Sequence, residues 1–93
     1  DETIGARVRR LRLARGLSAV GLSREVSVTE AAIRAIETGD SKSPSFVVGV
    51  LLAETLGVTP RYLAFGQDPV LEDRLRTIER HLGIAPERSG GDA

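Results

Sequence analysis

The 93-residue chain contains no cysteine, methionine or tryptophan, one histidine and only three aromatic residues. Without cysteine it forms neither a disulfide framework nor a thiolate metal site, and one histidine supplies little for zinc binding or Ser-His-Asp catalysis. No apolar run approaches the roughly 20 residues of a membrane span, and the first residues show no signal-peptide pattern. We therefore expect a cytoplasmic, non-enzymatic binding domain with no metal and no cofactor.

An excess of one charge is also missing, because 13 Lys and Arg residues balance 13 Asp and Glu residues. A nucleic-acid partner usually requires a basic surface, so this neutrality argues against one. The average conceals an asymmetry: residues 1–66 carry nine basic against seven acidic side chains (+2), and residues 67–93 carry four against six (−2). Any positive surface is expected in the first two-thirds of the chain.

Capping residues and glycines divide the sequence into short segments with apolar residues at helical spacing. The pattern predicts helices over about residues 3–15, 18–26, 29–38, 45–56, 59–65 and 68–82. There is no strand pattern and no internal repeat. We therefore predict an all-α fold with three parts: a five-helix bundle over residues 1–66, an additional amphipathic helix over 67–84 and a disordered tail over 85–93.

Four local patterns occur in order around the second to fifth helices. They are Arg-Gly-Leu-Ser before the second helix, a Val-Ser/Thr step into the third, Ile-x-x-Ile-Glu-x-Gly at its end and Leu-Gly-Val before the fifth. With them, the segments GLSAVGLSREVSVTEAAIRAIETGD and PSFVVGVLLAETLGVTPRYL resemble the Cro/cI-type helix-turn-helix family, also called the xenobiotic-response-element family. The resemblance covers Ile4 to about Gly66. It implies a lambda-repressor-like bundle that binds double-stranded DNA.

The helix-turn-helix geometry has a physical basis in the apolar residues. Four of them are expected to bury one seam between the second and third helices: Leu22, Val28, Ile33 and Ile36. The opposite face of the third helix then protrudes. The resemblance further implies an ion pair between Arg12 and Glu37. We interpret it as a structural link needed for folding rather than for recognition, because loss of one partner would leave the other charge partly buried without a counter-ion.

The protruding face of helix 29–38 is the expected reading surface. It presents Ala31, Arg34, Ala35 and Thr38, with Glu30 near its edge. Only Arg34 can donate two hydrogen bonds to one guanine, in a bidentate contact. The alanines can touch thymine methyl groups, and Glu30 repels phosphate unless it accepts a hydrogen bond from cytosine. Direct base reading is therefore expected to be sparse.

Phosphate contacts are expected around this reading surface. Ser18 can hold a phosphate through its hydroxyl and the helix N-terminus. The other candidates lie in the second helix, at the end of the third and in the following loop: Arg24, Thr38, Lys42 and Ser43. The cap residue Thr29 completes the DNA-binding set. For each phosphate candidate, a solvated surface role is an equally good interpretation.

The first helix has a basic side formed by Arg7, Arg9 and Arg10. This side either faces DNA or, as we favour, keeps the helix soluble.

Two helices carry more apolar residues than a small core needs. In the fourth, the expected core positions are Phe46, Val50, Ala53 and Leu56, whereas Val47, Val48 and Leu51 fall on another face. In the sixth, an a/d heptad stripe is formed by Leu71, Leu75, Ile78 and Leu82. The stripe either folds back on its own domain or pairs with a second copy, and the extra face on the fourth helix favours a twofold homodimer. Tyr62 and Phe65 are expected to close the core.

Two functions fit these features. In the favoured one, a homodimer places helix 29–38 in the major groove and acts as a sequence-specific transcriptional regulator. In the alternative, a degenerate helix-turn-helix serves as a protein–protein interaction module, either antitoxin-like or an accessory regulator, with weak or no operator binding. No nucleophile–base set and no phosphate-cradling glycine loop is visible, so we expect no enzyme.

Overall fold

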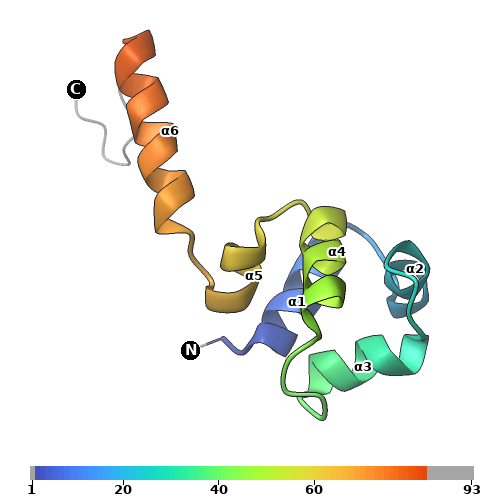
Figure 1. Ribbon diagram of the computed structural model, residues 1–93. Helices are drawn as coiled ribbons and strands as arrows, with labels where there is room; N and C mark the ends of the chain where they lie inside the picture. Colours follow the sequence, from blue (N-terminus) through green and yellow to red (C-terminus); the bar gives the residue numbers. More distant parts are fainter. Residues whose placement is uncertain (1, 84–93) are drawn as a thin grey trace.

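The computed structural model of the protein describes residues 2–83, so the disordered tail predicted over residues 85–93 lies outside the described part. Within residues 2–83, six helices follow one another: α1 (Ile4–Ala14), α2 (Ala19–Glu25), α3 (Glu30–Thr38), α4 (Phe46–Leu56), α5 (Pro60–Phe65) and α6 (Pro69–Leu82). No strand occurs among the described residues, which confirms the all-α prediction. Helices α1 to α5 form a bundle, and α6 projects away from it (Figure 1).

Each helix begins at a polar residue whose side chain accepts a hydrogen bond from the backbone N–H three residues further on. These N-caps are Thr3, Ser18, Thr29, Ser45, Thr59 and Asp68. Four of the helices end at a glycine in the left-handed conformation, as at Gly39 (φ 89°) and Gly57 (φ 76°). The helix boundaries are therefore determined locally, by caps and stop signals legible in the sequence.

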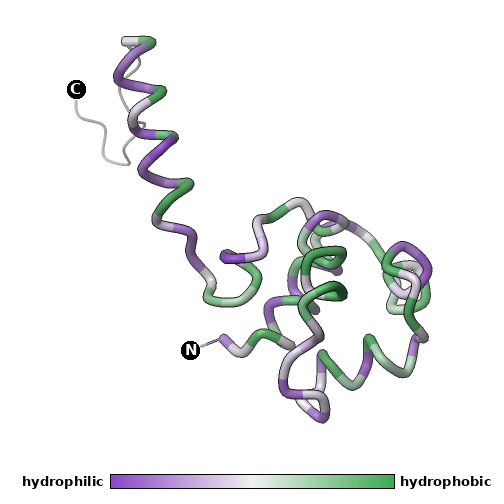
Figure 2. The backbone as a smooth tube through the Cα atoms, viewed as in Figure 1, coloured by the Kyte–Doolittle hydropathy of each residue, from purple (hydrophilic) through white to green (hydrophobic). Residues whose placement is uncertain are grey.

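Each of the five helices contributes at least one fully buried side chain to the core of the bundle, and the largest of these are Val8, Leu22, Ile33, Leu52 and Leu63. Burying a side chain of this size contributes about 1.5–3 kcal/mol. Helix α6 contributes no buried residue. Figure 2 shows its hydrophobic residues recurring along a helix that stands clear of the bundle.

Two aromatic residues expected in the core lie on the surface instead. Phe46 is 83% exposed and Phe65 is 66% exposed. On α4 the core side is formed by Leu52, Ala53 and Leu56, with Val48 and Leu51 packed against them partly buried. The prediction that Val48 and Leu51 lie on a separate face is therefore wrong. Because α4 is apolar nearly all round, its periodicity does not determine which side faces inward.

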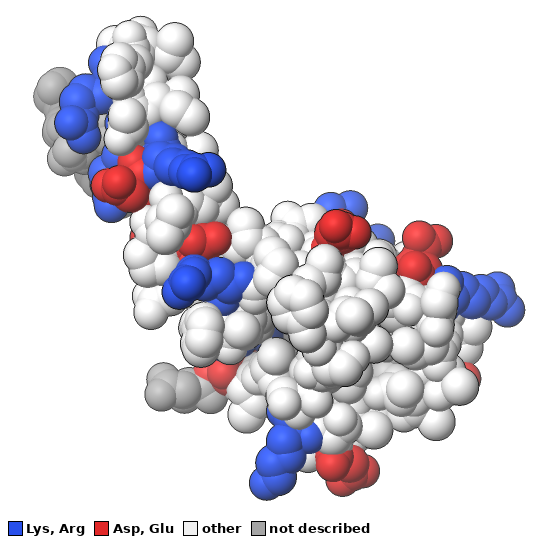
Figure 3. All heavy atoms as spheres, in the orientation of Figure 1, with Lys and Arg blue, Asp and Glu red and all other residues white. Residues whose placement is uncertain are grey.

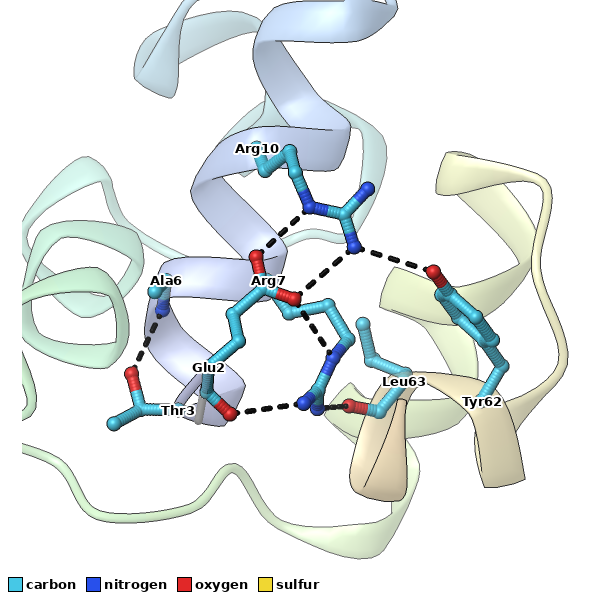
Figure 4. Close-up of polar contacts among 7 residues, drawn as sticks. All are labelled: Glu2, Thr3, Ala6, Arg7, Arg10, Tyr62 and Leu63. Carbon is cyan, nitrogen blue, oxygen red and sulfur yellow. Dashed lines mark hydrogen bonds and ion pairs between the residues drawn. The ribbon is translucent and has the colours of Figure 1, made fainter. Parts of the chain in front are cut away.

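A buried arginine joins α1 to α5 (Figure 4). Arg7 has 5% of its surface exposed, and its guanidinium donates to the carbonyl oxygens of Leu63 at 2.7 Å and Glu2 at 2.9 Å. Arg10 pairs with the Glu2 carboxylate at 2.8 Å and donates to the Tyr62 hydroxyl at 3.2 Å. The basic side predicted for the first helix is thus wrong for Arg7, because this side chain holds the bundle together and does not face solvent.

The same cluster makes stability depend on pH. The hydrogen bond from Arg10 is the main cause that lowers the pKa of Glu2 below its ordinary value. A carboxyl group whose pKa is lowered by folding stabilises the fold above its unfolded-state pKa. That contribution is lost as the pH falls through the lower, folded-state pKa.

Gly5 lies where α1 crosses the end of α3. A Cβ atom at this position would overlap the Ile36 carbonyl oxygen and lie 3.0 Å from the Glu37 carbonyl oxygen. These are backbone atoms, so the two helices would have to separate. The close approach of α1 to α3 therefore depends on the missing side chain.

We expect Gly5→Ala to lower the free energy of unfolding by about 1–3 kcal/mol, the usual cost of overpacking. Gly49→Ala is the matched control, because a Cβ there meets only Pro44 Cγ at 3.9 Å. In the interior of α4, this control is expected to raise stability by up to about 1 kcal/mol. Urea denaturation of the two variants measures the difference. Equal stability of the two variants would contradict the close packing of α1 on α3.

Candidate nucleic-acid interface

The turn between α2 and α3 is fixed by one residue in an uncommon conformation. Ser27 has a φ of 58°, in the left-handed region that side chains other than glycine rarely adopt. The next residue, Val28, donates from its backbone N–H to the Ser23 carbonyl oxygen at 3.0 Å. Leu22 and Ile33 are fully buried on either side of the turn. The angle between α2 and α3 is therefore set by backbone geometry and core packing together.

The ion pair between Arg12 and Glu37 is present and links α1 to α3. Arg12 Nε lies 2.7 Å from Glu37 Oε2, and Arg12 Nη2 lies 3.0 Å from Oε1. The two side chains are only 11% and 7% exposed. The third nitrogen, Nη1, donates to the Leu17 carbonyl oxygen at 3.0 Å, so one guanidinium anchors three segments. The hydrogen bond to Glu37 raises the pKa of Arg12.

The face of α3 opposite this ion pair and the core is accessible. Ala31, Arg34 and Thr38 are exposed, as expected. Ala35 is only half-buried rather than fully outward, because its carbonyl oxygen accepts a hydrogen bond from the Ser41 N–H at 2.9 Å as the chain turns back after α3. The reading surface is consequently narrower than the sequence predicted.

The basic side chain on this face is paired. Arg34 Nε donates to Glu30 Oε2 at 2.7 Å, and Arg34 Nη2 lies 2.5 Å from the same oxygen. The pair is solvent-accessible, with side-chain exposures of 65% and 39%. Its signal in the sequence is the spacing of four residues, which brings opposite charges together on a helix. Glu30 is the less exposed partner of the two, and the pair forms one unit on this face of α3.

The remaining candidates surround α3. Ser18 and Thr29 are exposed, although their hydroxyls already accept the capping hydrogen bonds of α2 and α3. Arg24 is exposed on α2, and Lys42 and Ser43 are exposed in the loop that follows α3. The structure thus keeps all of these side chains accessible around the helix-turn-helix unit. In the view of Figure 3, the bundle is largely uncharged over α4, and basic and acidic side chains occupy its margins.

Comparison with known proteins agrees with this geometry. Residues 3–64 match a protein family described as "Helix-turn-helix domain". The P22 c2 repressor, solved in complex with a synthetic operator, is similar with a TM-score of 0.68 and 25% identity, over 72% of this chain and 100% of that chain.

Two further structures share the fold. SinR, described as the master regulator for biofilm formation and solved with DNA, has a TM-score of 0.63 at 24% identity, over 66% of this chain and 97% of that chain. A complex of SinR with SinI has a TM-score of 0.65 at 22% identity, over 82% of this chain and 78% of that chain.

The chain therefore belongs to the helix-turn-helix domain family, with the lambda-repressor-like fold of Cro/cI-type repressors. Of the similar proteins, P22 c2 is described as a repressor and SinR as a master regulator, and both were solved with DNA. Within the described residues, no helix has the length and apolar character needed to cross a bilayer.

The ion pair between α1 and α3 should be essential for stability. Arg12→Ala leaves the Glu37 carboxylate buried without its partner, so we expect the free energy of unfolding to fall by about 3 kcal/mol. Arg9→Ala removes an exposed arginine from the same helix, and this control is expected to change stability by less than about 0.5 kcal/mol. Chemical denaturation followed by circular dichroism measures both. If Arg12→Ala lowers the free energy of unfolding by less than about 1 kcal/mol, roughly a third of the expected loss, the ion pair is not needed for stability.

Proposed function

We propose that the protein is a transcriptional regulator that binds double-stranded DNA sequence-selectively in the cytoplasm, as a homodimer with α3 in the major groove. One observation carries the proposal. The inner side of α3 is locked by Ile33, Ile36 and the Arg12–Glu37 pair, while the outer side, with Arg34, stays accessible. A helix held rigidly with one free face is what major-groove reading requires. The similar P22 c2 repressor and SinR were solved with DNA.

The proposed contacts to bases are few. Arg34 is the side chain on the outer face of α3 that can bridge both acceptors of a guanine, and Ala31 offers only a methyl group. Phosphate contacts from Ser18, Arg24, Lys42 and Ser43 fix the register without reading sequence. A single copy with so few contacts would bind weakly at physiological salt. Two copies on two half-sites compensate for this, which is why the proposal includes a dimer.

Helix α6 supports the dimer. The four residues of its apolar stripe, Leu71, Leu75, Ile78 and Leu82, are between 40% and 67% exposed. None of the four is buried in the core of the bundle, although Leu71 and Leu75 lie beside Val58 and Tyr62. A stripe that is exposed to this extent fits pairing with the same stripe of a second copy. Val47, 64% exposed, remains available for the interface, whereas Val48 and Leu51 already pack on their own core.

A second candidate function has its own support. Phe46 and Phe65 border an open apolar groove of about 410 Å³ between α4 and α5. Exposed apolar surface of this kind also occurs at protein interaction sites. The fold is shared with a structure in which SinR is bound to SinI. A protein–protein interaction module with weak or no operator binding therefore remains the alternative.

Arg34→Ala is expected to abolish sequence preference while leaving much of the non-specific affinity. The reason is that Arg34 provides the proposed bidentate contact, and each such contact gives about 1–3 kcal/mol of discrimination between bases. Selection of bound sequences from random duplexes with the wild-type chain, followed by binding of the selected and scrambled duplexes, measures this. Arg9→Ala, on an exposed position of α1, is the matched control and should keep the preference.

The same selection separates the two candidate functions. A DNA-binding regulator gives an enriched sequence and an affinity that falls steeply with salt. The absence of any enriched sequence, together with a shallow salt dependence, would favour the interaction module. Unchanged discrimination in Arg34→Ala would exclude this residue as the base reader.

Replacement of Leu75 and Ile78 by aspartate should convert the dimer into monomers, because each copy would place charges in the apolar stripe. Sedimentation analysis measures the mass. The control replaces Arg76 and Thr77, which are exposed on α6 away from the stripe, by aspartate and should remain dimeric. A dimer that survives the first double substitution would remove α6 from the interface.

A further inference from the structure

The ion pair on the outer face of α3 uses only part of the Arg34 guanidinium. One oxygen of Glu30, Oε2, contacts both Nε and Nη2. A guanidinium carries five N–H groups, one on Nε and two on each terminal nitrogen. The carboxylate therefore occupies the side edge, which is formed by Nε and Nη2. The end edge, formed by one N–H of Nη1 and one of Nη2, points away from Glu30 and stays open.

The open edge has the geometry that guanine requires. Guanine presents two acceptors, O6 and N7, in the major groove, and an arginine fork must offer two parallel N–H groups to bond both. Without a partner, Arg34 could approach through its side edge or its end edge and would sample many rotamers, since long side chains lose much entropy on binding. With Glu30 on the side edge, only the end-on approach remains.

The contact between Glu30 and Arg34 itself adds little to the stability of the fold, although Glu30 also places a negative charge in the first turn of α3, where the helix dipole favours it. Both side chains are solvent-accessible, and an exposed pair at this spacing contributes little to stability. The start of α3 is already capped by the Thr29 hydroxyl, which accepts from the Ala32 N–H at 3.1 Å. Glu30 also places a negative charge on the surface proposed to meet phosphates, which lowers affinity. An acidic residue at this position is explained if it improves selectivity at the expense of affinity.

We propose that Glu30 is a positioning residue for base recognition: it holds Arg34 with its end edge outward and so confers selectivity for guanine. This inference rests on the proposed DNA-binding function and adds to it the residue that directs the reading side chain. The contact with guanine is made by Arg34, and Glu30 acts through it.

The test compares Glu30→Ala with the wild-type chain on the duplex recovered by selection. The guanine in question is the base whose preference Arg34→Ala loses. Replacing it by 7-deazaguanine removes the N7 acceptor and keeps base pairing. We expect the wild type to lose about tenfold in affinity on this change, the value of one arm of a bidentate contact. Arg34→Ala should be insensitive to it.

For Glu30→Ala we expect two changes in opposite directions. Discrimination between guanine and 7-deazaguanine should fall below about threefold, because Glu30 no longer holds the end edge of the Arg34 guanidinium toward the base. Affinity for scrambled duplex should rise, because one negative charge has been removed from the binding surface. Glu25→Ala is the matched control: it removes the same charge from an exposed position on α2 and should raise affinity without loss of discrimination.

The outcomes separate the inference from the function on which it rests. If the wild type enriches a sequence and Glu30→Ala keeps the full discrimination, the positioning role is overturned and DNA reading by Arg34 stands. If the wild type enriches no sequence, the proposed function fails and the inference fails with it. In the free protein, a change in the exchange rate of the Arg34 Nε proton between wild type and Glu30→Ala supports the role, and an unchanged rate opposes it.

Discussion

The buried ion pair between Arg12 and Glu37 is the interaction on which the position of α3 depends. Its three hydrogen bonds join α1, α3 and the segment before α2 through one guanidinium. A charge taken out of water is costly unless its partners are fixed, so this network is satisfied in a single arrangement. Gly5 adds a steric condition at the same crossing, because it lets the backbones of α1 and α3 approach. Electrostatics and close contact thus hold α3 from one side and leave its other side accessible.

Much of this could be predicted from the sequence, because the signals are local. Every helix starts at a residue with a side-chain oxygen that was recognisable as a cap, and four stops are glycines. The Arg12–Glu37 pair followed from the resemblance to the Cro/cI-type family, which supplied a long-range contact that spacing alone does not reveal. The accessible positions of α3 followed from helical geometry once Ile33 and Ile36 were placed inward.

What the sequence did not reveal depends on tertiary context. Phe46 and Phe65 are large and apolar, and only the packing of α4 and α5 shows that Leu52 and Leu63 occupy the core in their stead. Arg7 had the pattern of a solvated surface residue, but the carbonyl oxygens of distant Leu63 and of nearby Glu2 accept its hydrogen bonds and hold its charge inside. Ser27 adopts a left-handed conformation without the glycine or asparagine that usually announces one.

The position of α6 has a mechanical consequence. The first half of the helix adjoins the bundle, where Leu71 and Leu75 lie beside Val58 and Tyr62. Its 14 residues span about 21 Å, so a rotation of about 10° at this joint moves the far end by about 4 Å. In the proposed dimer, α6 is a lever arm between the two reading helices. The spacing of half-sites that such a dimer accepts is then determined by the joint residues at the start of α6, far from the bases themselves.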